Sequence, residues 1–258
     1  MHGHQPRKRF GQHFLADPHY VEKIVDAIGP KADDNVVEIG PGLAALTGAL
    51  IKRAGRIAAI EIDRDLAARL RERFPSDRLA LHEADALAFD FAMLGADLRI
   101  VGNLPYNISS PLLFRLAAFE ARLRDIHAML QREVVARMTA VPATPDYGRL
   151  SVMLQSRFRV TRLFTVPPGA FRPPPKVESA VARLVPLGDL KPLIADDALF
   201  ARIVAAAFGQ RRKTLRNALA AFASEAQLRT AGIDPGLRGE ALTVADFVRL
   251  ANTLAGER

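Results

Sequence analysis

Residues 35–47, Asn-Val-Val-Glu-Ile-Gly-Pro-Gly-Leu-Ala-Ala-Leu-Thr, decide the fold class of this chain of 258 residues. The apolar run at 35–39 has the length of a short strand, Gly40-Pro-Gly42 is a turn sequence, and residues 43–52 have the composition of a helix. Glycines allow the backbone to turn sharply and to approach a ligand closely. The same motif also occurs in dinucleotide-binding enzymes and in turns that bind nothing, so on its own it leaves these alternatives open.

Strand and helix patterns alternate on both sides of this segment. Strands are predicted at 56–62, 79–82, 98–101 and 126–131, and helices at 64–74 and from Asp17-Pro18 to the stop at Gly29-Pro30. This alternation indicates an α/β fold with a mostly parallel sheet that helices cover on both faces. Further strands are expected near 157–163 and 177–184, whereas five prolines in 167–175 exclude regular structure there.

The pattern becomes purely helical after Pro186-Leu-Gly188. Apolar side chains recur there at helical spacing, on Phe200, Ile203, Val204, Ala207 and Phe208 and then on Leu215, Leu219 and Phe222. We therefore expect two domains. Residues 1–186 would form the α/β domain, and residues 187–258 would form a small all-helical C-terminal domain.

The composition is that of an ordinary globular protein with an excess of basic residues. Lys and Arg number 36 against 28 Asp and Glu, a net charge of +8 that favours polyanionic partners such as nucleic acid. No apolar stretch is long enough to span a membrane and no secretory signal is evident, so we expect a cytoplasmic protein with no membrane partner. The absence of cysteine excludes disulfides and thiolate chemistry, and without a His-Glu-x-x-His pattern we expect no metal.

Acidic side chains follow two of the predicted strands. Glu61 ends the second strand, 21 positions after Gly40, and Asp85 follows the third. A carboxylate at the first position can accept hydrogen bonds from ribose hydroxyls, and one at the second could accept a hydrogen bond from an adenine amine. Because ligands bind at the carboxyl edge of such sheets, Gly40, Glu61 and Asp85 should line one crevice.

Asn103-Leu-Pro-Tyr106 follows the fourth predicted strand and resembles the catalytic motif of amino-group methyltransferases. The lone pair of an adenine N6 amine is delocalised into the ring, so the amine is a poor nucleophile. Hydrogen bonds from it to the side-chain oxygen of Asn103 and the backbone carbonyl of Leu104 would favour a more tetrahedral nitrogen. Pro105 would stiffen the turn and Tyr106 would stack on the base, so that positioning supplies much of the rate.

Six motifs, in order along the chain, resemble those of the ribosomal RNA adenine dimethyltransferase family. They are Arg9-Phe-Gly-Gln-His-Phe-Leu15, Glu38-Ile-Gly-Pro-Gly42, Ile60-Glu-Ile-Asp63, Asn103-Leu-Pro-Tyr106, Phe171-Arg-Pro-Pro-Pro-Lys-Val-Glu-Ser179 and Phe208-Gly-Gln-Arg-Arg-Lys-Thr-Leu-Arg-Asn217. The likeness is greatest to the bacterial small-subunit type. It implies a Rossmann-like class I methyltransferase domain that uses S-adenosylmethionine to convert two adjacent adenosines of small-subunit (16S) ribosomal RNA to N6,N6-dimethyladenosine. The target would be a hairpin loop near the 3′ end of the RNA, in an assembling small subunit.

The same resemblance implies roles for individual residues. The cofactor site would comprise His13, Leu15, Gly40, Glu61, Asp85 and Asn103. Phe171 would form a second aromatic wall of the adenine pocket, facing Tyr106. The family usually has a third glycine where this chain has Ala44, and we expect Ala44 to lie harmlessly in the first helical turn.

Two groups of cations are candidate RNA contacts. The first is Arg7, Lys8 and Arg9, and the second, expected on a C-terminal helix, is Arg211, Arg212, Lys213 and Arg216. Both could bind RNA phosphates, which position a substrate without reading its sequence. The alternative for each group is a solvated charged face, but a reaction on a polyanionic substrate favours RNA binding.

Other interpretations remain open. An NAD-dependent dehydrogenase would share the glycine turn and Glu61 but would leave Asn103-Leu-Pro-Tyr106 unexplained. A ribosome assembly factor acting mainly by binding would keep the fold without turnover. The third interpretation is a large-subunit methyltransferase of the macrolide-resistance type, but the helical appendage and Gln210-Arg-Arg-Lys213 favour the small-subunit type. DNA adenine methylation shares the amine chemistry but fits these same segments poorly. We expect a monomer.

Overall fold

The chain forms two compact units in the computed structural model, which describes residues 13–256. The first unit comprises the described residues up to Val135 together with Val160–Pro186. The second comprises Ala136–Arg159 and the chain from Leu187 onward. A boundary after residue 186 was expected, but residues 136–159 were expected in the first domain. They join the second unit because Tyr147 and Val152 are buried in its apolar core beside Phe200.

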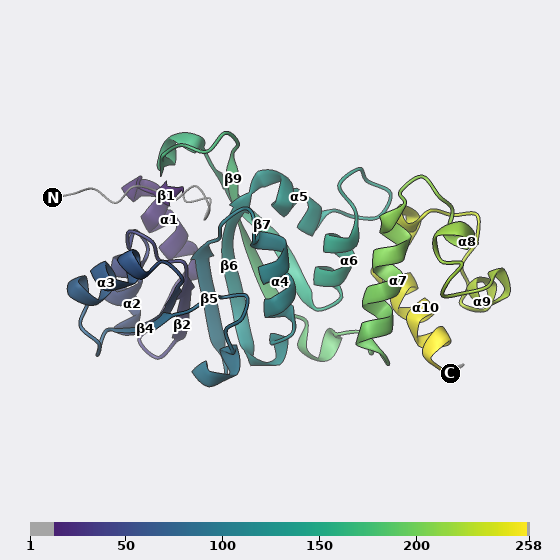
Figure 1. The fold of residues 1–258 in the computed structure, drawn as a ribbon, viewed down its shortest axis with the longest axis horizontal. Helices are drawn as coiled ribbons and strands as arrows, with labels where there is room; N and C mark the ends of the chain where they lie inside the picture. Colours follow the sequence, from purple (N-terminus) through teal and green to yellow (C-terminus); the bar gives the residue numbers. More distant parts are fainter. Residues whose placement is uncertain (1–12, 257–258) are drawn as a thin grey trace. The chain divides into compact units, whose positions relative to one another are not determined.

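A seven-stranded sheet forms the centre of the first unit (Figure 1). Its order is β4 (Leu79–Glu83), β3 (Ile57–Glu61), β2 (Asn35–Ile39), β5 (Leu98–Asn103), β6 (Leu123–Gln131), β9 (Ser179–Pro186) and β7 (Phe158–Val166). The first five strands pair in parallel, and β9 runs antiparallel to β6. The mostly parallel sheet predicted from the sequence is therefore confirmed, with the chain order reversing direction at β2, where such sheets bind ligands.

Both faces of this sheet are covered. On one face α1 (Pro18–Ile28) and α2 (Thr47–Ala54) share a core with Val36, Val101 and Met129. Side chains alternate along a strand, and the neighbouring Ile100 is buried as fully as Val101, so the opposite face is covered too. The remaining helices of the first unit are α3 (Arg64–Arg73), α4 (Ser109–Ala117) and the start of α5 (Arg132–Thr139).

Helix α1 begins and ends where its sequence predicts. The Asp17 side chain accepts a hydrogen bond from the N–H of His19, Pro18 occupies the first turn, and Gly29 ends the helix in the left-handed conformation (φ 57°). Helix α2, in contrast, begins at Thr47 rather than at residue 43. The intervening residues form a turn that extends the glycine loop.

A two-stranded ribbon joins the N-terminal segment to the proline-rich segment. Strand β1 (Phe14–Leu15) pairs antiparallel with β8 (Phe171–Arg172), with Leu15 opposite Phe171. The expectation of no regular structure in 167–175 is wrong for these two residues. They precede the run of prolines at 173–175, so their backbone groups are still available for pairing.

The second unit is built from helices α6 (Arg149–Gln155), α7 (Asp197–Gly209), α8 (Leu215–Ala218), α9 (Glu225–Thr230) and α10 (Val244–Gly256), together with the end of α5 and short 3₁₀ turns. Helix α7 lies against α6, α8 and α10. Its predicted apolar face is buried, with Phe200, Ile203 and Val204 at the centre of the core. Among the described residues, no helix is both long and apolar enough to cross a membrane.

Candidate active site

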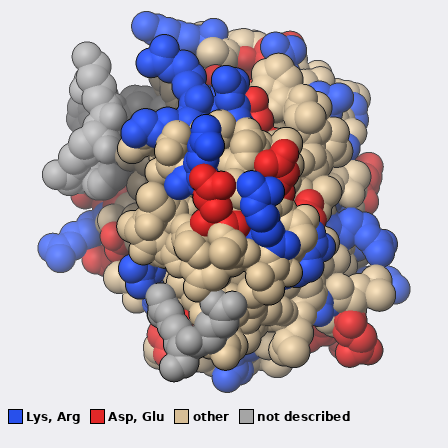
Figure 2. All heavy atoms as spheres, turned by 90° about the vertical axis from the view of Figure 1, so that its right-hand side faces the viewer, with Lys and Arg blue, Asp and Glu red and all other residues tan. Residues whose placement is uncertain are grey.

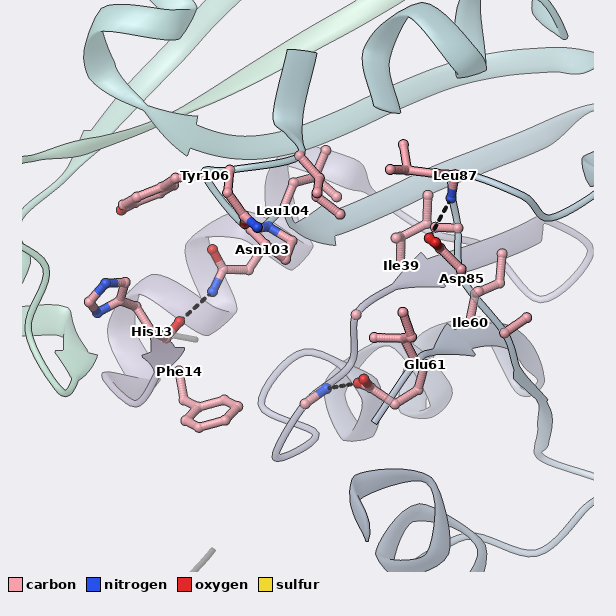
Figure 3. Close-up of a pocket in the computed structure, with 18 residues that line it drawn as sticks. His13, Phe14, Ile39, Ile60, Glu61, Asp85, Leu87, Asn103, Leu104 and Tyr106 are labelled. Carbon is pink, nitrogen blue, oxygen red and sulfur yellow. Dashed lines mark hydrogen bonds between the residues drawn. The ribbon is translucent and has the colours of Figure 1, made fainter. Parts of the chain in front are cut away.

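A pocket opens at the carboxyl ends of the parallel strands in the first unit (Figure 3). Most of the residues predicted from strand ends line it, namely Gly40, Glu61, Asp85, Asn103, Leu104, Pro105 and Tyr106, together with His13 from the N-terminal segment. Ile39, Ile60, Ile62, Leu87 and Ile108 add apolar walls. An apolar pocket with carboxylates among its lining residues matches the chemistry of a nucleoside ligand.

The glycine loop forms one side of this pocket. Gly40 (φ 67°) donates its N–H to the carbonyl of Ile60 at 2.9 Å, and Gly42 (φ 59°) donates its N–H to a Glu61 carboxylate oxygen at 3.1 Å. Positive φ favours glycine at both positions. A Cβ on Gly42 would also lie 3.0 Å from the ring of Phe14, so the second glycine lets the N-terminal segment approach the loop.

Glu61 is held as a fixed acceptor on the pocket floor. Only 4% of the residue is exposed, and its two carboxylate oxygens accept the N–H groups of Gly42 and, at 3.0 Å, Asp63. Burial raises the pKa of Glu61 above its ordinary value, and the backbone hydrogen bonds oppose that shift by stabilising the charged form. A carboxylate anchored in this way keeps lone pairs for ribose hydroxyls.

Glu38 is a second buried carboxyl group, to which the sequence analysis gave no role of its own. It accepts a hydrogen bond from Thr47 Oγ1 at 2.7 Å, and burial, together with the charge of Glu61, raises the pKa of Glu38 to about 7. It lies beside a smaller pocket under the glycine loop, which Leu15 and Phe14 also line. The signal in the sequence was a charged residue inside an otherwise apolar buried strand.

Asp85 lies at the end of the main pocket opposite His13 (Figure 3). Its Oδ1 accepts the N–H of Leu87 at 2.9 Å, which orients the carboxylate as an Asx turn (Figure 3). The other carboxylate oxygen makes no hydrogen bond to the described residues. The geometry therefore leaves an acceptor for an exocyclic amine.

Asn103 ends β5 with its side-chain amide in a defined orientation. Its Nδ2 donates to the carbonyl of His13 at 2.7 Å, and its Oδ1 points away from that carbonyl, on the side of Tyr106 (Figure 3). The N–H of Leu104 donates to Met129 of β6 at 3.1 Å, while the carbonyl of Leu104 accepts no hydrogen bond within residues 13–256. Two acceptors on adjacent residues thus remain for a donor with two N–H bonds.

Three contacts fix the position of Tyr106. Its hydroxyl lies 2.7 Å from Ser179 Oγ, its carbonyl accepts a hydrogen bond from Ser109 Oγ at 3.0 Å, and its ring stacks on His13 with centroids 5.7 Å apart. Burial raises the pKa of Tyr106, so the phenol stays protonated at neutral pH. The ring is a rigid apolar surface beside Asn103.

Phe171 does not face Tyr106, contrary to expectation. It is fully buried in the core shared with Leu15 and Val181 and lines neither pocket. The cause is the pairing of β8 with β1, which places Phe171 opposite Leu15 and directs its ring inward. The ring that faces Tyr106 in this structure is the imidazole of His13.

Ala44 also departs from expectation, because it lies in the glycine loop rather than in a helical turn. Its φ is 65°, a left-handed conformation that costs an L-residue roughly 1–2 kcal/mol. Its methyl group is buried in the core, which returns roughly 0.8 kcal/mol. Ala44 lines neither pocket, although its neighbours Leu43 and Ala45 line the smaller one.

Gly102 was not identified from the sequence, yet the structure admits no side chain there. A Cβ would lie 2.6 Å from the carbonyl oxygen of Ile39 and 2.8 Å from Leu104 Cδ2. Gly102→Ala should therefore displace the adjacent Asn103-Leu104 segment and destabilise the protein by about 1–3 kcal/mol. Urea denaturation and kcat measured together test this. A variant with unchanged stability and unchanged kcat would contradict the tight packing.

Three of the C-terminal cations, Arg211, Arg212 and Lys213, lie in a turn between α7 and α8 and not on a helix as expected, whereas Arg216 lies on the short helix α8. Helix α7 ends at Gly209, which is a poor helix former, so the chain leaves the helix before the cations. Arg211 is 3.7 Å from Glu240, and Arg216 is 3.8 Å from Glu225. Arg212 and Lys213 are exposed and form no ion pair with any residue that the structure describes. The other predicted cations, Arg7, Lys8 and Arg9, lie outside the described residues.

Comparisons with known proteins show the family of this chain. The family model for ribosomal RNA adenine dimethylase matches residues 3–256. A relative from Aromatoleum aromaticum, the ribosomal RNA small subunit methyltransferase A, is 62% identical over 257 residues, covering 100% of this chain and 97% of the relative. A dimethyladenosine transferase from Plasmodium falciparum has a TM-score of 0.80 at 25% identity, covering 92% of this chain and 96% of that one. The 23S ribosomal RNA methyltransferase ErmE has a TM-score of 0.68 at 28% identity, covering 94% and 99%.

The parallel sheet, the glycine loop and the Asn103-Leu-Pro-Tyr106 turn define a class I methyltransferase. With a family model that matches nearly the whole length, the chain belongs to the ribosomal RNA adenine dimethylase family. The dehydrogenase interpretation is thereby excluded.

Proposed function

We propose that this protein transfers methyl groups from S-adenosylmethionine to the N6 amines of two adjacent adenosines in small-subunit ribosomal RNA. A relative that is 62% identical is named ribosomal RNA small subunit methyltransferase A. The observation that carries the proposal is the pair of acceptors formed by Asn103 Oδ1 and the carbonyl of Leu104, beside the ring of Tyr106. The substrate would be the RNA of an assembling small subunit in the cytoplasm. The protein would act on it as a monomer.

The main pocket offers hydrogen-bond acceptors that suit S-adenosylmethionine. Glu61 would accept hydrogen bonds from the ribose hydroxyls and Asp85 from the adenine amine, between the apolar walls of Ile60 and Leu87. The glycine loop and the smaller pocket beside Glu38 would take the methionine end. When bound, this cofactor supplies an electrophilic methyl group on a sulfonium.

The residues of the turn would position the target amine. In the first transfer, Asn103 Oδ1 and the Leu104 carbonyl would accept its two N–H bonds, which localises the lone pair on nitrogen and directs it at the methyl group. In the second transfer the N-methylamine has one N–H left, which one of the two acceptors would bind. Tyr106 offers the stacking surface for a base that has left its own stack, which a hairpin loop makes less costly. The proton that leaves the nitrogen after transfer passes to water, because the neutral product amine needs no strong base to form.

The second unit would contact the RNA backbone. Lys and Arg side chains gather toward the upper part of the face drawn in Figure 2, whereas much of its lower part carries neither sign of charge. The exposed Arg212 and Lys213 are the two cations of the turn that are free for phosphate. The cluster that they form with the ion-paired Arg211 and Arg216 is the proposed electrostatic contact.

Removal of these two cations should weaken RNA binding without changing the reaction. For Arg212→Ala/Lys213→Ala, the slope of log K against log salt should fall in magnitude by about 1.4–1.8, since each phosphate contact contributes about 0.7–0.9. The control Arg53→Ala/Arg71→Ala removes two charges that already have carboxylate partners, Asp26 and Glu83. Equal slopes of log K against log salt for the two double variants would show that this turn does not contact the RNA.

Substrate choice tests the proposed function directly. Small and large ribosomal subunits lacking adenine methylation would each be incubated with the protein and labelled S-adenosylmethionine. Label in small-subunit RNA alone supports the proposal. Label in large-subunit RNA alone would support the macrolide-resistance type of activity, and binding to small subunits without label would support a purely assembly role.

A further inference from the structure

The hydroxyl of Ser179 lies at one end of the only hydrogen bond that the Tyr106 phenol makes with the described residues. The two oxygens are 2.7 Å apart, Ser179 is fully buried, and Tyr106 is partly buried. A buried hydroxyl without a hydrogen-bond partner destabilises the folded protein. The bond between these two hydroxyls is therefore favoured over conformations that break it. The bond joins residues 73 positions apart in the chain.

Ser179 stands on a rigid part of the sheet, whereas Tyr106 stands on a turn. Ser179 begins β9 and pairs with Gln131 of β6. The preceding peptide is also fixed, because the N–H of Arg132 donates to the carbonyl of Glu178 at 2.9 Å. Tyr106 follows the last strand residue, Asn103, by three positions and has no strand partner. This side-chain bond therefore ties the ring of Tyr106 to the sheet.

We propose that Ser179 is a positioning residue for methyl transfer, which acts by fixing the ring of Tyr106 beside the amine acceptors. The inference rests on the proposed catalytic role of the Asn103-Leu-Pro-Tyr106 turn. With the phenol anchored at Ser179 and the ring stacked on His13, the ring keeps one orientation before any base arrives. The base is then stacked at no further ordering cost, which is the form in which positioning contributes to rate.

The anchor should matter for kcat and not for cofactor binding. Ser179 lines neither pocket, and the groups expected to bind the cofactor, Glu61 and Asp85, make their own hydrogen bonds to the backbone. Loss of the Ser179 hydroxyl frees the ring to swing about the Cα–Cβ bond while leaving those groups in place. A general loss of structure would instead weaken the cofactor site as well.

A double-mutant cycle tests the proposal. Ser179→Ala and Tyr106→Phe should each lower kcat about tenfold, and the double variant should also be about tenfold down, because both changes break the same bond. The affinity for S-adenosylmethionine, measured by calorimetry, should change by less than about threefold. The control Ser156→Ala removes an equally buried hydroxyl, which donates to the Met153 carbonyl at 3.0 Å, and should keep kcat within about twofold.

A readout without turnover separates this inference from the proposed function. The chain has three tyrosines, so Tyr106 can be assigned in ring-labelled protein by its absence from the Tyr106→Phe spectrum. Its ring should keep one χ1 orientation in the wild type and exchange between orientations in Ser179→Ala, seen as averaged or broadened ring signals. Equal ring dynamics in the two proteins would overturn the proposal, as would kcat losses that multiply to about a hundredfold. An inactive wild type would sink the proposed function, and the ring dynamics would still decide the role of Ser179.

Discussion

Replacement of Asn103 by alanine is expected to lower kcat for methyl transfer by about a hundredfold to a thousandfold, the loss that follows removal of one preorganised polar group at a reacting centre. Two contacts disappear together. The amine loses the acceptor Oδ1, and the carbonyl of His13 loses the hydrogen bond from Nδ2. Single-turnover rates at saturating S-adenosylmethionine measure the effect on the chemical step.

The variant Asn103→Asp serves as the matched control. It keeps an acceptor oxygen at the same place but cannot donate to the His13 carbonyl. It should therefore retain more activity than the alanine variant, while both bind the cofactor within about tenfold of the wild type. An alanine variant that keeps more than about a tenth of the wild-type rate would show that the side chain of Asn103 is not the critical acceptor.

The second large effect concerns stability, at Arg99. This residue lies near the start of the central strand β5, at the opposite end of the strand from the pocket. Arg99 is 8% exposed and hydrogen bonds to Asp125 through Nε (3.0 Å) and Nη2 (2.8 Å), and to Asp34 through Nη1 (2.7 Å). Arg99→Met would leave two buried carboxylates without their main cation. We expect a loss of about 3–5 kcal/mol of unfolding free energy at pH 7, measured by urea denaturation.

An exposed ion pair gives the comparison. Arg53 is 2.6 Å from Asp26, but its side chain is 38% exposed, so Arg53→Met should have a far smaller effect than Arg99→Met. Equal losses from the two substitutions would mean that the buried network contributes no more than a surface pair.

The loss at Arg99 should depend on pH with a definite sign. Burial alone would raise the pKa of Asp34 and of Asp125, but hydrogen bonds and the nearby positive charge of Arg99 hold both pKa values below the ordinary range. Lowered carboxyl pKa values stabilise the fold above about pH 4, the unfolded value, and that stability is lost as the pH falls further. The difference between wild type and Arg99→Met should therefore be largest near neutral pH and shrink below about pH 4. A constant difference would contradict the ionic account.

The fold and the centre of the site were predictable because their signals are local. The period of apolar residues predicted β2 at residues 35–39 as observed, and strands of a parallel sheet end at one edge by geometry. Glu61, Asp85 and Asn103 come at the ends of three such strands, so their meeting in one pocket follows from the topology. The amine chemistry of the Asn103 turn was inferred from its resemblance to the catalytic motif of amino-group methyltransferases and stays a prediction.

Several of the parts that were wrong or missed depend on contacts between distant segments. The direction of the Phe171 ring is set by its pairing with Leu15, and the stacking of His13 on Tyr106 by the path of the N-terminal segment. No local pattern encodes either contact. The position of residues 136–159 in the second unit likewise follows from the burial of Tyr147 and Val152.

The product nucleosides show whether the protein dimethylates adenine N6. Small subunits lacking adenine methylation would be incubated with labelled S-adenosylmethionine and the protein, beside the Asn103→Ala variant, and the RNA would be digested to nucleosides and to 3′-terminal fragments. The account predicts N6,N6-dimethyladenosine at two adjacent positions in a hairpin loop near the 3′ end, absent or sharply reduced with the variant. A folded, cofactor-bound wild type that labels no adenosine, or labels a nucleoside at a position other than N6, would contradict it.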